Sequence, residues 1–150
     1  MTLSEKIIED IKTAMKSKDQ DQLLVLRGLN SAIKNKLIDR KEQDSTIEVL
    51  SEEDSLSVIL SEAKKRKDAV LIYAQAGRDD LVNKEKEELQ IIEKYLPAQL
   101  SKEEVSEKIK SILDNNPEVK EIGPAMGLVM KELKGKADAS LVSEVLKSFF

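Results

Sequence analysis

Apolar residues recur at helical spacing along most of the chain, which predicts long helices joined by short polar segments. The first predicted helix covers residues 2–18. Thr2 and Glu5 stand three residues apart at its start, the spacing at which a hydroxyl and a carboxylate cap a helix reciprocally. Its periodic apolar positions are Leu3, Ile7, Ile11 and Ala14.

The next segments predict one central helix and one long hairpin. Residues 19–38 can begin at an aspartate cap and are apolar around much of their circumference, so we expect this helix to be central. Residues 39–50 lack a clean period and predict a loop or a single turn. The runs 51–76 and 79–96 predict two antiparallel helices, with Gly77 at the turn between them in a left-handed conformation.

The predicted helices become shorter after Pro97. Shorter helical runs follow, and the glycines and prolines between them end each run. We therefore predict an all-α fold with two domains: an N-terminal long-helix hairpin domain over 1–96 and a small three-helix domain over 97–150. The three predicted short helices start at about residues 101, 123 and 138.

Composition agrees with helices and removes several classes of function. Charged residues make up 36% of the chain, and five glycines and three prolines are too few for a turn-rich β architecture. With two Tyr, two Phe and no Trp, stacking platforms for single-stranded nucleic acid are nearly excluded.

Cysteine and histidine are both absent, which excludes thiolate nucleophiles, imidazole bases and nearly every zinc, haem or iron–sulfur site. We expect no catalytic residue, no metal and no cofactor. The first residues form a charged amphipathic segment without the apolar core of a signal peptide, and no stretch approaches membrane-spanning length. The sequence therefore predicts a cytoplasmic protein that does not associate with membranes.

Charge argues against bulk attraction to nucleic acid. The net charge is -4, and no region of the chain is basic overall, so any RNA contact must use a local patch. One basic tetrad exists, but consecutive helical residues point about 100 degrees apart and cannot all face one ligand. We favour a solvated helix surface, paired with Glu62 and Asp68, over a phosphate-binding patch. The tetrad is Lys64, Lys65, Arg66 and Lys67.

Two acidic clusters raise the possibility of magnesium binding or acid–base chemistry. Exposed helix surfaces and stabilisation of helix N-termini explain both clusters more simply. The clusters are Glu85, Glu87 and Glu88, and Glu52, Glu53 and Asp54.

The segment 123–138 is the most informative part of the chain. Gly127 lies inside a predicted helix, where glycine costs about 1 kcal/mol relative to alanine, so a close approach to its backbone is expected. The approaching group could be another helix of the chain, which we favour on these residues alone, or a phosphate backbone held by nearby lysines. Gly135 as a helix C-cap and Asp138 as the next N-cap explain much of the rest. The candidate binding residues are Gly123, Gly127, Gly135, Lys131, Lys134 and Lys136.

These residues carry a resemblance to a known family. The pattern from Gly123 through Met126-Gly-x-Val-Met-Lys131 to Ala137-Asp138 resembles the C-terminal signature shared by YqeY proteins and the tail of GatB, a subunit of the glutamine-dependent aminoacyl-tRNA amidotransferase. Four further segments are similar to YqeY proteins in the same order, so the resemblance covers essentially the whole chain. They are Arg27-Gly-Leu-Asn-Ser-Ala-Ile-Lys34, Lys65-Arg-Lys-Asp68, Ala76-Gly-Arg-Asp-Asp-Leu81 and Tyr95-Leu-Pro-Ala-Gln-Leu100.

The resemblance implies a non-catalytic accessory protein that binds tRNA or a tRNA-handling complex, with the lysines and glycines of 123–136 as contacts. Many relatives have Gly-Lys where this chain has Gly123-Pro124, which removes one cation and suits a first helical turn. A helical protein-interaction module without RNA contact is the alternative. Carbon–nitrogen ligase activity with glutamine as amido donor would belong to a larger complex.

Overall fold

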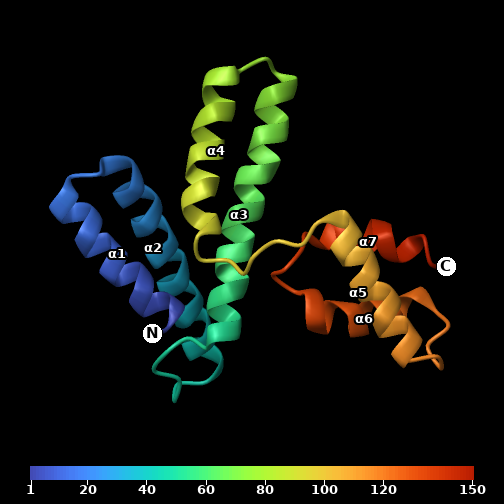
Figure 1. Cartoon of the computed structure of the whole chain (residues 1–150). Helices are drawn as coiled ribbons and strands as arrows, with labels where there is room; N and C mark the ends of the chain where they lie inside the picture. The colour runs from blue at the N-terminus through green and yellow to red at the C-terminus, as the bar shows by residue number, and fades with distance from the viewer. The chain divides into compact units, whose positions relative to one another are not determined.

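The computed structural model describes residues 1–150, and every regular element in it is a helix (Figure 1). The all-α prediction is confirmed. No helix combines the length and the apolar character that crossing a bilayer requires. The helices are α1 (Leu3–Ser17), α2 (Gln20–Gln43), α3 (Glu52–Gln75), α4 (Asp79–Glu93), α5 (Lys102–Asn115), α6 (Ile122–Leu133) and α7 (Ala139–Lys147).

The helices group into two compact units with separate cores. Met1–Leu96 holds α1 to α4, and Pro97–Phe150 holds α5 to α7. Local side-chain caps start most helices. Thr2 and Glu5 form the expected capping box on α1, and Ser51 and Ser101 each accept a hydrogen bond from the backbone three residues on. A cap of this kind contributes about 1 kcal/mol because it satisfies an otherwise unpaired helix N–H.

The first core is built around α2, which packs against α1, α3 and α4. Its central position follows from its broad apolar surface, as predicted. Tyr95, just after α4, is 6% exposed, and its hydroxyl donates to the Asp10 carboxylate on α1. Burial, together with the Asp10 carboxylate, raises the pKa of the Tyr95 hydroxyl. The buried residues of this core are Ile7, Ala14, Leu23, Val25, Leu26, Leu29, Ile33, Leu50, Ile59, Ala63, Ile92 and Tyr95.

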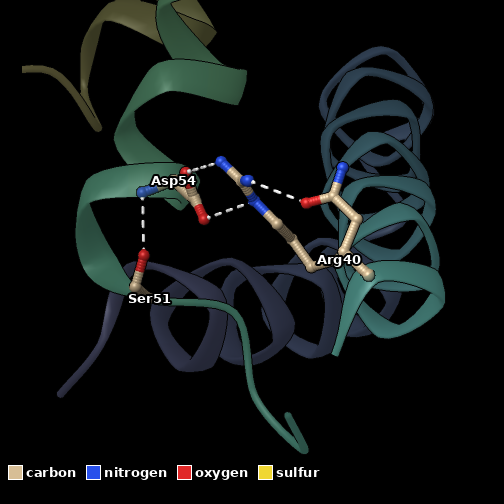
Figure 2. A network of polar contacts seen from close by, with 4 residues as sticks. Arg40, Ser51 and Asp54 are labelled. Carbon is tan, nitrogen blue, oxygen red and sulfur yellow. Dashed lines mark hydrogen bonds and ion pairs between the residues drawn. The ribbon is translucent and has the colours of Figure 1, made fainter. Parts of the chain in front are cut away.

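Helix α2 ends at Gln43, so the prediction that it stops near Ile38 is wrong. Beyond Ile38 the hydrophobic period is lost, but polar residues continue the helix because a contact to α3 holds its last turn. Figure 2 shows the guanidinium of Arg40 directed at the Asp54 carboxylate, with Nε–Oδ2 at 3.0 Å and Nη2–Oδ1 at 2.9 Å. The Arg40 hydrogen bonds lower the pKa of Asp54, whose backbone N–H also donates to the Ser51 hydroxyl.

Helices α3 and α4 lie side by side as the predicted hairpin (Figure 1). Gly77 turns the chain at φ +71, the left-handed conformation expected there. On α4 the buried residue nearest the turn is Val82, whereas its neighbour Leu81 is partly exposed.

Three short helices enclose the second core, and α6 contributes one side of it. Because successive turns of α6 place Ala125, Val129 and Leu133 in this core, the opposite side of α6 is left to solvent. The other core residues of the unit are Val105, Ile109, Ile112, Ala137, Val142, Val145 and Leu146.

Candidate functional site

Four of the six predicted glycines and lysines lie on the solvent side of α6, whereas Gly135 is buried and lies with Lys136 in the turn that follows the helix. Gly123, Gly127 and Lys131 follow one another at intervals of four residues, and Lys134 is the C-cap of the same helix. Residues three and four apart on a helix lie on one face. All four are exposed, and we call them the α6 edge.

No part of the chain approaches the two glycines of the α6 edge. A Cβ atom added at Gly123 or Gly127 would have no atom within 4 Å. The expectation that Gly127 packs against another helix of the chain is therefore wrong. The reason is the register of α6, which turns Ala125 and Val129 into the core and Gly127 away from it.

The turn after α6 is held in one shape by the segment that precedes α5. Gly135 has φ +82, which L side chains rarely adopt, and it follows the C-cap Lys134. The side-chain amide of Gln99 donates to the carbonyl oxygen of Gly135 at 2.9 Å, and the backbone N–H of Leu100 donates to that of Lys136 at 2.8 Å. These contacts join residues 36 apart, so spacing along the sequence could not reveal them.

The three predicted lysines all reach solvent near the end of α6. Lys131 lies in the last helical turn, Lys134 caps the helix, and Lys136 lies in the turn that Leu100 holds. Cations in this place also stabilise the negative end of the helix dipole. Asp138 closes the segment as the N-cap of α7, accepting from the Ser140 backbone N–H at 3.1 Å.

The basic tetrad on α3 does not form a single cationic surface. Glu62 accepts from Lys65 at 3.1 Å and from Arg66 at 2.6 Å, so one carboxylate takes two of the four cations. Burial opposes ionisation of Glu62, but these hydrogen bonds outweigh it and lower the pKa of its carboxyl. Lys64 is exposed and Lys67 partly exposed, in different helical directions. The tetrad is therefore a weaker candidate than the α6 edge.

Two of the residues in the acidic clusters make structural contacts within the first unit. Glu52 accepts from the backbone N–H of Leu3 at 3.2 Å, and Asp54 accepts from Arg40. On α4, burial and then the neighbouring Glu88 raise the pKa of Glu85. Nowhere in the chain do three His, Cys, Asp or Glu side chains gather as a metal site would require.

Fold and site together define an all-helical protein of two units, the second of which displays a basic edge built on exposed glycines. The chain belongs to the YqeY family, because the family model described as Yqey-like protein matches residues 4–150.

Several fungal proteins are similar along most of the chain, and each is named altered inheritance of mitochondria protein 41, mitochondrial. The protein from Kluyveromyces lactis is 36% identical over 143 residues, which cover 93% of this chain and 71% of the relative. The one from Lachancea thermotolerans is 34% identical, covering 88% and 68%, and the one from Pyrenophora tritici-repentis is 30% identical, covering 92% and 75%.

Proposed function

We propose that this protein is an accessory factor without its own catalytic step that binds tRNA through the α6 edge and Lys136. One observation carries the proposal. Gly127 and Lys131 share a solvent-facing side of α6, and no atom of the chain fills the space above Gly127. A glycine there lets a foreign backbone come close while the neighbouring ammonium groups contact its charge.

A phosphodiester backbone fits this arrangement. Phosphates carry one negative charge per nucleotide and are contacted mainly by lysine, arginine and backbone N–H groups. Double-stranded RNA is recognised by its shape and phosphates rather than by base edges, so a smooth helix face with lysines at its end suits it. The absence of aromatic platforms favours such a folded RNA over a single strand.

The resemblance to the tail of GatB directs the proposal to tRNA among folded RNAs. Hydrogen bonds from Gln99 and Leu100 hold the turn that carries Lys136 in one conformation. A preformed conformation reduces the entropy lost on binding. Carbon–nitrogen ligase activity would require the other subunits of an amidotransferase. We expect the isolated chain to release no ammonia from glutamine.

The test compares tRNA binding by the wild type and by the Lys131→Ala/Lys134→Ala/Lys136→Ala variant in a filter-binding assay across a salt series. We expect the affinity of the wild type to fall steeply with salt. Each lysine removed should lower the slope of log K against log salt by about one.

A matched control removes the same charge elsewhere in the second unit. Lys108, Lys110 and Lys120 are exposed and lie outside the α6 edge, so changing these three to Ala should leave tRNA affinity nearly unchanged. Equal losses in both triple variants would mean that bulk charge alone drives binding and would reject the site.

The cytoplasm remains the predicted compartment of this chain. The relatives carry mitochondrial names, so the mitochondrion is the alternative compartment. Imaging of the tagged full-length protein in its own cells decides between them.

A further inference from the structure

Helix α2 has one solvent-facing side that no other helix covers. Its core residues lie on the opposite side, and the exposed residues recur at intervals of three and four, so they share one helical face. Leu24 is 64% exposed and Ile38 55% exposed, although both are large and apolar. We call this side the α2 outer face: Leu24, Arg27, Gly28, Ser31, Lys34 and Ile38.

The centre of the α2 outer face is small and open. Gly28 lies in the interior of a 24-residue helix, where alanine would be more favourable, and a Cβ atom there would have nothing within 4 Å. Ser31 is the next exposed residue on this side. Small residues at a helix crossing let two helix axes approach closely. Large apolar residues on either side of a small centre suit a second helix.

The charge of the α2 outer face identifies the chemistry of that helix. The side chains of Arg27 and Lys34 make no hydrogen bond or ion pair in the chain, and residues 22–38 contain no acidic side chain, although the net charge is -4. Two copies of this face would repel each other. RNA would leave Leu24 and Ile38 without an apolar partner.

We propose that the α2 outer face docks an amphipathic helix of a partner protein, with apolar residues that cover Leu24 and Ile38 and acidic residues along one flank that pair with Arg27 and Lys34. This surface is distinct from the α6 edge and does not depend on the tRNA proposal. Together the two surfaces would make the chain an adaptor, with a protein on its first unit and RNA on its second.

The test titrates the full chain, labelled with nitrogen-15, with three synthetic helical peptides of equal length. The first has a leucine stripe flanked by glutamates, the second has the same composition in an order without a stripe, and the third has lysines in place of glutamates. We expect the first to shift the amides of α2 in a saturable manner and to bind at least about tenfold more tightly than the others, because the second lacks a stripe that can cover Leu24 and Ile38 and the third sets its lysines against Arg27 and Lys34.

Paired variants separate this surface from the α6 edge. Gly28→Gln places a helix-forming side chain in the open space and should weaken the first peptide about tenfold without changing tRNA affinity. Gly127→Gln is the matched control and should do the reverse. Arg27→Glu with Lys34→Glu should weaken the acidic peptide and strengthen the lysine peptide. Circular dichroism confirms that each variant keeps its helix content.

Five outcomes would overturn the proposal. The first peptide could fail to bind at millimolar concentration, or it could shift only amides outside α2. The striped and unstriped peptides could bind equally, which would reduce the face to a charge effect. Finally, the double glutamate variant could dissociate a dimer in sedimentation, or lose tRNA binding, which would give the face to a second copy or to RNA.

Discussion

Replacing Gly127 by Ala tests whether the α6 edge is open, because the expected sign is opposite to that for a packed glycine. The backbone of Gly127 is helical, and the added methyl group would meet nothing within 4 Å. Alanine is favoured over glycine in a helix interior by about 1 kcal/mol, chiefly because glycine loses more backbone entropy on folding. We therefore expect Gly127→Ala to stabilise the second unit by up to about 1 kcal/mol.

Gly135→Ala provides the control within the same unit. At φ +82 an L side chain is strained, and the left-handed conformation costs roughly 1–2 kcal/mol per residue. This variant should therefore destabilise the second unit by roughly that amount. The two substitutions add the same methyl group at positions eight residues apart in one unit, so only the backbone conformation and the space around each glycine distinguish them.

Hydrogen exchange of the slowest amides of α5, α6 and α7 measures the stability of this unit directly, because the two units need not unfold together. For a unit of this size, a change of 1 kcal/mol also moves the melting temperature by about 5 °C or more. A loss of stability in Gly127→Ala comparable with that in Gly135→Ala would refute the reasoning, because it would mean that part of the chain lies against Gly127.

Three further predictions concern the first unit. Tyr95→Phe removes the hydrogen bond to the Asp10 carboxylate and should lower the free energy of unfolding in urea by about 1.5–3 kcal/mol. Because the pKa of Tyr95 is raised in the folded state, the stability of the wild type should be full below the unfolded tyrosine pKa of about 10 and should fall as the pH rises further. Ser55 is 1% exposed with an unpaired hydroxyl, so Ser55→Ala should be neutral or stabilising by up to about 1 kcal/mol, whereas Ser51→Ala should cost about 1 kcal/mol as a lost cap. Because the pKa of Asp54 is lowered in the folded state, this carboxylate contributes stability above its unfolded pKa that is lost as the pH falls through the folded value. The free energy of unfolding should therefore fall less steeply with acidification in Asp54→Asn than in the wild type.

Helix starts were predictable from the sequence because their determinants are local. The reciprocal contact of Thr2 and Glu5 spans three residues, and Ser101 and Asp138 cap helices from the adjacent position. The left-handed glycine at 77 is likewise a property of one residue at the end of one run. Each of these features depends on side chains within a single turn, which the spacing of residue types expresses directly.

The end of α2 and the shape of the 134–137 turn were not predictable, since both depend on contacts between distant segments. Arg40 is held by Asp54 across a loop, and Gln99 reaches Gly135 across two helices. The openness around Gly127 was mispredicted for a related reason. The sequence showed an unusual glycine but not which side of its helix the neighbouring helices would cover.

The five glycines of the chain fall into two groups, which have different physical causes. Gly77 and Gly135 adopt positive φ, so the fold itself requires them. Gly28, Gly123 and Gly127 lie in helices, and added Cβ atoms there would meet nothing, so the fold would be more stable with alanine at interior positions such as 28 and 127. A stability cost without an internal cause is expected at surfaces that serve a function. The open glycines lie on α2 near Arg27 and on α6 near Lys131, so a stability cost at these positions is what the two proposals predict, since each requires a negatively charged partner close to the helix backbone.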